Sequence, residues 1–147
     1  MKKTSPSYIT KLAPNEIFVF GSNLAGRNGK GAAKLAQDKF GAKYGIGIGF
    51  SGQSYAIPTK DGTNGQSLSD PRATLPLEEI KEYVSDFLYD AEGCPELIFL
   101  VTEIGCGLAG YDVSDIAPMF ETAQENVWLP NRFVIFLEKD KGTGEKI

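Results

Sequence analysis

Short runs of apolar residues alternate along the chain with segments in which apolar and polar residues are mixed. The apolar runs contain nearly continuous Val, Ile, Leu and Phe, which is typical of strands covered on both faces of a sheet. Four such strands are predicted, over Glu16–Phe20, Ser54–Thr59, Glu96–Ile104 and Arg132–Glu138. The segment Ser7–Leu12 is expected to add an edge strand before them.

Three of the mixed segments have apolar residues at helical spacing. In the second, a proline opens the segment, two glutamates follow and a glycine comes just after the end, which are typical boundary signals of a helix. We therefore expect helices from about Gly29 to Phe40, from Pro76 to Ala91 and from Ser114 to Gln124.

Strands that alternate with helices predict an α/β domain with a largely parallel sheet. The 147 residues are the size of one domain, and no Pro/Ser-rich linker or long charge run divides them. We expect a single domain over residues 1–147, with its core at about 16–138 and a polar, frayed tail at 139–147. In such folds, ligands bind at the carboxyl ends of the strands.

Charge and hydropathy narrow the classes of partner. A formal net charge of −4 argues against nonspecific binding to nucleic acid or to anionic membranes. No apolar stretch reaches membrane-spanning length, and the basic start lacks the apolar middle of a signal peptide. We expect a soluble, cytoplasmic protein.

The chain contains no histidine and only two cysteines, Cys94 and Cys106. Two cysteines are too few for a disulfide framework. The absence of histidine excludes Ser-His-Asp and Cys-His nucleophile pairs and leaves no plausible zinc site, so we expect no metal. We expect no cofactor either. Acid–base chemistry would have to come from Asp, Glu, Lys or Tyr.

Two glycine-rich loops follow predicted strands, "GSNLAGRNGKG" from Gly21 and "IGCGLAGY" from Ile104. Successive backbone N–H groups in such loops form concave anion sites, and a helix N-terminus after the loop adds to the attraction. Two such loops suggest a pyrophosphate held from both sides, whereas the alternative is a pair of tight structural turns. The first loop has the glycine spacing of a P-loop, but Arg27 and Asn28 replace its lysine and hydroxyl residue.

These loops also resemble a known family. "IFVFGSNLAGRNGKGAAKLA" resembles the macrodomain pattern, and "LIFLVTEIGCGLAGY" is similar to that family's second phosphate loop. The "GCGL" form is similar to macrodomains that hydrolyse terminal ADP-ribose esters and to antitoxin macrodomains, and "SYAIPTKD" resembles their central strand. Over about Glu16–Phe136, the chain is similar to uncharacterised macrodomain-like proteins of bacteria and phages. The resemblance implies a three-layer α/β/α fold with a mixed, mostly parallel sheet.

The resemblance also implies a ligand, ADP-ribose or a related NAD-derived nucleotide, free or attached to a modified macromolecule. Asn23 is then expected to hydrogen-bond the distal ribose, and Tyr111 to lie near it. Around the ribose and its phosphate we expect Gly29, Gly31 and Ala32. The pyrophosphate would be held by the backbone N–H groups of Gly105, Cys106, Gly107, Leu108, Ala109 and Gly110.

The chain departs from the family at two positions that bear on function. It lacks the "GDI" motif whose aspartate binds the adenine amine, which leaves the base preference open. Ala109 stands where the hydrolases of the "GCGL" group have an acidic residue.

Catalytic candidates are therefore few. They are Lys30, Lys60 and Asp112, each with a plainer interpretation: a solvated loop charge, a polar strand end and a helix-start residue. We interpret Cys106 as a small buried residue that supports its loop. The long polar segment Asp61–Thr74 is expected to be mobile and to face the ligand.

Three functions follow from this pattern. The first is a module that binds ADP-ribose or a relative. The second is a hydrolase that releases ADP-ribose or phosphate from a modified protein or nucleic acid. The third is an interaction protein that keeps the scaffold without binding a nucleotide.

Overall fold

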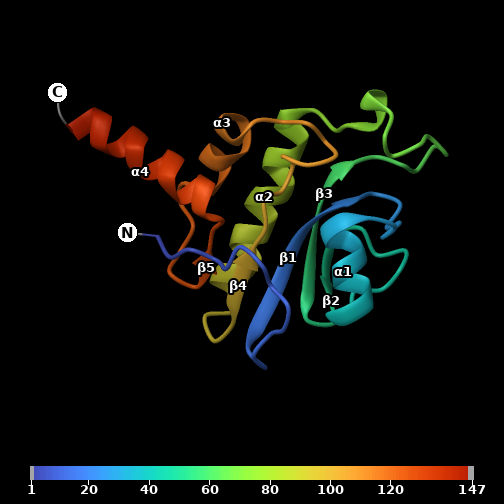
Figure 1. Cartoon of the computed structure of the whole chain (residues 1–147), viewed down its shortest axis with the longest axis horizontal. Coiled ribbons are helices and arrows are strands. Elements are labelled where there is room, and N and C mark those ends of the chain that lie inside the picture. Colours follow the sequence, from blue (N-terminus) through green and yellow to red (C-terminus); the bar gives the residue numbers. More distant parts are fainter. Residues whose placement is uncertain (1, 146–147) are drawn as a thin grey trace.

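A five-stranded sheet with the order β2-β3-β1-β4-β5 forms the centre of the protein (Figure 1). The computed structural model describes residues 2–145, and the side chains of residues 2–139. Strand β1 pairs in parallel with β3 on one side and with β4 on the other; β5 is parallel to β4, and β2 is antiparallel to β3. The strands are β1 (Glu16–Asn23), β2 (Gly49–Ser51), β3 (Ser54–Lys60), β4 (Ile98–Val101) and β5 (Val127–Trp128).

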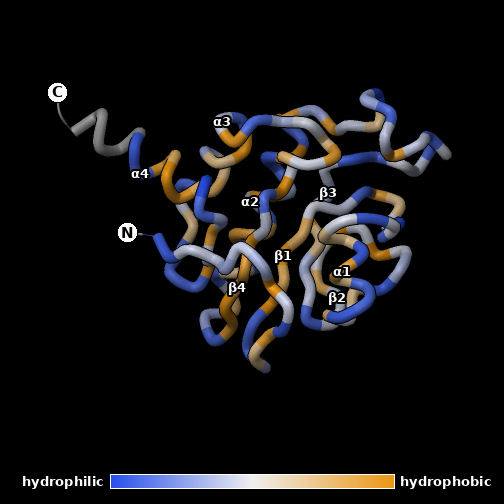
Figure 2. Tube along the Cα trace, viewed as in Figure 1, coloured by the Kyte–Doolittle hydropathy of each residue, from blue (hydrophilic) through white to orange (hydrophobic). Residues whose placement is uncertain are grey.

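Helices cover both faces of this sheet (Figure 1). They are α1 (Gly31–Lys39), α2 (Leu77–Glu92), α3 (Val113–Ile116) and α4 (Asn131–Glu145), with short 3-10 helices η1 (Pro71–Ala73) and η2 (Ala117–Phe120). On β1, Phe18 and Phe20 pack with α1, while Ile17 and Val19 pack with α2, η2 and α4. Because alternate residues of a strand point to opposite faces, β1 is buried on both sides, and its middle residues, Ile17 to Phe20, are all hydrophobic (Figure 2).

The chain connections diverge at the two central strands. From β1 the chain passes through α1 to β2 and β3 on one side, and from β4 it passes through α3 to β5 on the other. Helices α1 and α3 thus begin near the carboxyl ends of neighbouring strands but turn to opposite faces of the sheet. Such a switch point leaves a crevice at the carboxyl ends of the strands.

The predicted α/β domain with a mostly parallel sheet is confirmed. The first three predicted strands are present as β1, β3 and β4, and the first two predicted helices are α1 and α2. The sequence pattern missed the two shortest strands, β2 and β5, which have three and two residues.

The prediction of a strand over Arg132–Glu138 is wrong, because this segment lies in α4. Its buried residues Phe133, Val134 and Leu137 follow helical spacing, and Ile135 between them is 55% exposed. A short apolar run is compatible with either element, and here the β-branched and aromatic residues gave the wrong indication. Residues 139–145 of the expected tail continue α4, and residues 146–147 lie outside the described residues.

Two other predicted elements are also wrong in part. The expected helix Ser114–Gln124 is a four-residue α3 followed by the 3-10 helix η2, because Pro118 lacks the N–H group that a continuous α-helix needs there. The expected edge strand Ser7–Leu12 has no strand structure; instead, Thr4 forms a single parallel bridge with Leu129.

None of the helices in residues 2–145 combines the length and the apolar character that crossing a membrane requires.

Because residues 132–138 lie in the helix α4, substitutions at two nearby positions should change the free energy of unfolding by different amounts. Phe133 is fully buried against Phe120, whereas Ile135, two residues later, is more than half exposed. Phe133→Ala is expected to lower the free energy of unfolding by about 3–5 kcal/mol, and Ile135→Ala by about 0.5 kcal/mol or less. Urea unfolding of both variants measures the difference, and equal losses would contradict the helical packing.

Candidate functional site

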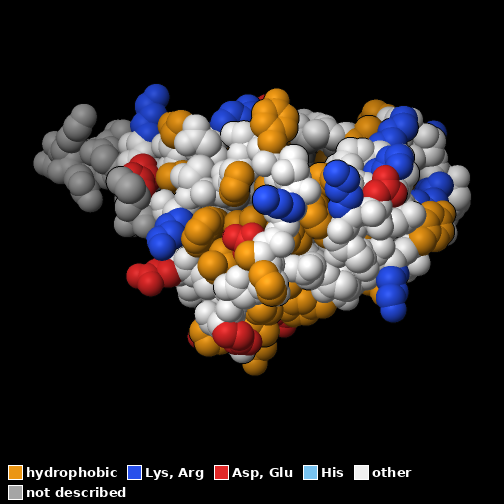
Figure 3. Space-filling model, turned by 60° about the horizontal axis from the view of Figure 1, so that its bottom comes forward, with side chains coloured by type: hydrophobic (Ala, Val, Ile, Leu, Met, Phe, Trp, Pro, Cys, Tyr) orange, Lys and Arg blue, Asp and Glu red, His pale blue; other side chains and the backbone are white. Residues whose placement is uncertain are grey.

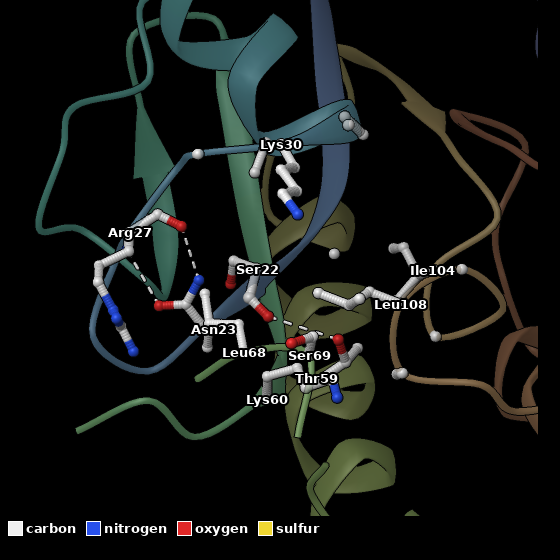
Figure 4. Close-up of a pocket in the computed structure, with 18 of the residues that line it drawn as sticks. Ser22, Asn23, Arg27, Lys30, Thr59, Lys60, Leu68, Ser69, Ile104 and Leu108 are labelled. Atoms are coloured by element: carbon white, nitrogen blue, oxygen red, sulfur yellow. Dashed lines mark hydrogen bonds between the residues drawn. The ribbon is translucent and has the colours of Figure 1, made fainter. Parts of the chain in front are cut away.

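A cavity of about 630 Å³ lies at the carboxyl ends of β3, β1 and β4, at the switch point. We call it the switch-point cavity. Its walls come from the first loop (residues 24–30), the first turn of α1, the end of β3, the wall segment (residues 62–69) and the second loop (residues 102–112). Ser22, Lys30, Thr59 and Leu108 approach this space from different elements (Figure 4).

The N-terminus of α1 opens onto the cavity. Lys30 is the residue before the helix, and no side chain caps the free N–H groups. The first turn of a helix has N–H groups without intrahelical partners, and its end carries a partial positive charge. Gly31, Ala32 and Ala33, which form this turn, all line the cavity. The position therefore suits an anion.

The second loop presents further N–H groups from the opposite side. It is closed by hydrogen bonds from the Tyr111 N–H to the Gly105 carbonyl (2.9 Å) and from the Gly110 N–H to the Gly107 carbonyl (3.0 Å). The N–H groups of Gly107, Leu108 and Ala109 take part in no hydrogen bond among the described residues. All three residues line the cavity. The loop thus offers unpaired donors to a bound group.

Glycines in these loops and in the segment packed against the first loop fall into two kinds. A methyl group on Gly26 would lie 2.3 Å from the Gly45 carbonyl carbon, and one on Gly47 would lie 2.0 Å from the Asn23 carbonyl oxygen. Glycine at these two positions lets backbones pack closely. At Gly29 and Gly107, by contrast, a methyl group would meet nothing within 4 Å, and neither residue has a positive φ.

The fold itself does not require glycine at positions 29 and 107, yet both line the cavity. A ligand that contacts the backbone closely is a physical reason for glycine there.

The charges around the cavity are mostly positive. Arg27, Lys30 and Lys60 line it, and among the described residues Glu103 is the one acidic side chain that does so. Glu103 forms a bidentate ion pair with Arg132: Nη2 donates to Oε1 at 2.6 Å and Nε donates to Oε2 at 2.7 Å. These hydrogen bonds from the guanidinium lower the pKa of the Glu103 carboxyl. This pairing offsets the charge of the one carboxylate that would repel an anion.

The positive charge extends beyond the cavity. Residues 24–60 contain six of the chain's 15 Lys and Arg residues but one of its 19 Asp and Glu residues. Lys and Arg outnumber acidic side chains on the right-hand half of the face in Figure 3, the side on which α1 lies in Figure 1. The net charge of −4 therefore hides a local excess of positive charge around the site.

Lys60 is 4% exposed at the end of β3. Burial lowers the pKa of its ammonium group, and the charge of Asp70 opposes this shift. The Lys60 Nζ donates to the Asp70 carbonyl at 3.4 Å. This lysine is the buried titratable group of the cavity.

Asn23 lines the cavity at the end of β1 and is 4% exposed. Its Nδ2 donates to the Arg27 carbonyl (2.7 Å), and its Oδ1 accepts from the Arg27 N–H (2.9 Å). The amide that the resemblance places on a ribose is therefore already engaged in holding the first loop. Loss of this side chain would disturb the loop as well as any contact with a ligand.

The structure brings most of the expected ligand-binding residues to the cavity, namely Asn23, Gly29, Gly31, Ala32, Gly105, Gly107, Leu108 and Ala109, together with Lys30 and Lys60. Four others do not line it: Cys106, Gly110, Tyr111 and Asp112.

The surroundings of these residues suggest structural roles. The pKa of the Cys106 thiol is raised to about 11, mainly by burial and to a lesser extent by the charge of Glu103. The Tyr111 hydroxyl donates to the Leu75 carbonyl at 2.6 Å. Asp112 precedes α3, and its N–H donates to Asp115 at 3.0 Å.

Tyr44, Ser67, Leu68 and Ser69 also line the cavity. The last three belong to the polar segment Asp61–Thr74, which was expected to face the ligand. All four lie in connecting segments that reach the cavity only through tertiary packing.

A second cavity of about 790 Å³ adjoins the first, and the two share Ala32, Thr102 and Glu103. Its walls come from residues 5–10, β1, α1 and the start of α4. It contains aromatic and apolar surface from Tyr8, Phe18 and Leu35 beside the Glu103–Arg132 pair.

Among the side chains of residues 2–139, no group of three or more Cys, Asp and Glu is arranged to hold a metal ion. Comparison with protein-family models, with curated proteins and with solved structures finds no match to this chain.

The two kinds of glycine should respond differently to substitution. Gly29→Ala and Gly107→Ala are expected to leave the free energy of unfolding unchanged or to raise it by up to about 1 kcal/mol, because alanine restricts the unfolded chain. Gly26→Ala, at a φ of 71° and against the Gly45 backbone, is expected to lower it by more than about 1 kcal/mol. Thermal and urea unfolding test this, and a loss at position 29 or 107 as large as that at 26 would assign those glycines to the fold.

Proposed function

We propose that this protein binds ADP-ribose or a related NAD-derived nucleotide in the switch-point cavity. The observation that carries the proposal is that unpaired backbone N–H groups reach the same cavity from two sides. One set belongs to the first turn of α1 and the other to Gly107, Leu108 and Ala109 of the second loop. Two phosphates joined in a pyrophosphate match two such donor groups. The resemblance of both loops to the macrodomain pattern points to the same class of ligand.

Local charge supports an anionic ligand. Lys30 is exposed at the cavity and Lys60 is buried in it, while the charge of Glu103 is offset by Arg132. Backbone donors carry no net charge, which allows a protein of net charge −4 to bind phosphates at one place without a strongly basic surface.

The adjoining second cavity suits the rest of such a ligand. A nucleotide with its pyrophosphate between α1 and the second loop can extend past Ala32 and Thr102 into this space. There, Tyr8 and Leu35 offer an aromatic and apolar surface for a base. Both oxygens of Glu103 accept from Arg132, so the site contains no free carboxylate dedicated to an adenine amine.

Calorimetric titration with ADP-ribose tests the proposal, with ADP, AMP and ribose 5-phosphate titrated alongside. Binding of ADP-ribose is expected to weaken at least tenfold, about 1.4 kcal/mol, in Gly29→Ala and in Gly107→Ala, because both glycines line the cavity and the added methyl group takes up space that no protein atom fills. These variants are cleaner probes than Asn23→Ala, since the Asn23 amide also holds Arg27.

Binding of a different phosphate compound in place of ADP-ribose would retain the site and change its ligand. No binding of any of the four compounds would contradict the proposal and favour the interaction protein. For that alternative the exposed apolar side chains Tyr44, Ile46, Ile48 and Phe50 offer a surface.

Lys60 favours a second candidate function, a hydrolase that releases ADP-ribose from a modified macromolecule. Burial favours the neutral amine of Lys60. Such an amine can attack the anomeric carbon of the attached ribose and displace the macromolecule's linking atom, after which water cleaves the lysine–ribose bond and releases ADP-ribose. Lys60 lines the cavity, whereas Asp112 does not, and Lys30 is exposed. Of the three catalytic candidates, Lys60 therefore has the surroundings best suited to this role.

An ADP-ribosylated protein and an ADP-ribosylated oligonucleotide serve as substrates to test the hydrolase. Lys60→Arg is expected to abolish release of ADP-ribose while keeping a cation in the cavity, and Lys30→Arg is the matched control that should retain activity. Because the pKa of Lys60 is lowered, the reactive neutral amine forms as pH rises through a value below 10.5, and release should increase in that direction. Equal release by parent and Lys60→Arg, or none by either, would contradict this function.

A further inference from the structure

The wall segment, residues 62–69, has few links to the body of the protein. Within residues 61–74 it is organised by local hydrogen bonds, such as that from the Asp70 N–H to the Ser67 carbonyl (3.0 Å) and from the Gln66 N–H to Asn64 Oδ1 (3.2 Å). To the described chain outside residues 61–74 it makes two hydrogen bonds, and both come from Nη2 of Arg27.

The two bonds attach separate points of the segment to one guanidinium. Nη2 donates to the Gln66 carbonyl at 2.9 Å and to the Gly62 carbonyl at 3.2 Å. Gly62 has a φ of 72°, and a methyl group there would lie 2.9 Å from Nη2, so glycine permits this close approach. A charged donor makes stronger hydrogen bonds to carbonyl oxygens than a neutral one does.

Arg27 is itself held rigidly from the sheet. Its N–H and carbonyl groups both bond the buried amide of Asn23, the last residue of β1. In Figure 4, these two bonds fix the Arg27 backbone while the guanidinium turns away from Lys30. Continuous contacts therefore run from the end of β1 through Asn23 and Arg27 to the wall segment.

The wall segment matters to the cavity because Ser67, Leu68 and Ser69 line it. The residue that follows, Asp70, accepts through its carbonyl from the buried Lys60. If residues 62–69 moved away, the cavity would lose one wall and Lys60 would gain contact with solvent.

We propose that Arg27 is a positioning residue that latches residues 62–69 in place as a wall of the switch-point cavity and thereby slows the release of the bound nucleotide. The part of this proposal that concerns a nucleotide rests on the proposed function; the latch itself does not. Arg27 acts through the segment that it holds and not as a catalytic residue.

The latch is tested without ligand by hydrogen–deuterium exchange of the backbone amides. Arg27→Gln is expected to speed exchange within residues 62–69 at least tenfold and to leave the amides of β1 and β4 unchanged. Arg27→Lys, which keeps a charged donor but loses the fork geometry, should fall between parent and Arg27→Gln. Arg72→Gln is the matched control, because Arg72 is exposed and pairs with Asp70 inside residues 61–74.

The effect on the ligand is measured by surface plasmon resonance with immobilised protein and ADP-ribose as the probe. Arg27→Gln is expected to raise the dissociation rate about tenfold with a smaller change in the association rate, and Arg72→Gln to change neither. A purely structural loss would instead reduce the fraction of protein that binds.

The outcomes separate the latch from the ligand. Unchanged exchange at residues 62–69 in Arg27→Gln would overturn the latch whether or not ADP-ribose binds. Faster exchange with an unchanged dissociation rate would overturn the role of the wall in retaining the nucleotide. Faster exchange in a protein whose parent form binds no ADP-ribose would support the latch and count against the proposed function alone.

Discussion

The parallel pairing of β1 with both β3 and β4 brings the ends of three strands to one edge of the sheet. This is the constraint on which the candidate site depends, because each of these strands is followed by a segment that lines the cavity. The pairing is stable because β1 is buried on both faces, by Phe18 and Phe20 toward α1 and by Ile17 and Val19 toward α2 and α4. Burial of these side chains holds the strand in register and so sets where the first loop begins.

From that edge outward, the site consists largely of backbone. Close packing of the loops depends on Gly26 and Gly47, where any side chain would collide with a neighbouring backbone. Gly29 and Gly107 line the cavity and have open space where a side chain would begin, and the N–H groups of Gly107, Leu108 and Ala109 have no partner within the described protein. Recognition by backbone donors explains how an acidic chain can offer a site for an anion, with Lys30, Lys60 and the paired Glu103 setting the local charge.

The first loop has two functions in this arrangement. Its backbone lines the cavity, and its one arginine reaches across to hold the wall segment. Arg27 occupies the position at which a P-loop would have its phosphate-binding lysine, but its guanidinium bonds carbonyl oxygens of the chain itself. The Asn23 side chain is likewise bonded to the chain itself, through the Arg27 backbone. Both polar side chains therefore hold the structure of the site in addition to lining it.

The sequence by itself was sufficient for the features that depend on local pattern. These are the buried strands β1 and β3, the amphipathic helix α2 and the two glycine loops that follow strands, since apolar periodicity and glycine placement report directly on the nearby backbone. The resemblance to macrodomains, also read from those loops, remains the basis of a proposal about the ligand.

Tertiary structure decided the rest. The run Arg132–Glu138 is compatible with either element, and packing of Phe133 on Phe120 made it a helix. The side chains of Asn23 and Arg27 found partners within the chain. The polar segment Asp61–Thr74 was expected to face the site, but no local pattern encodes the bonds that attach residues 62–69 to Arg27, up to 39 residues away.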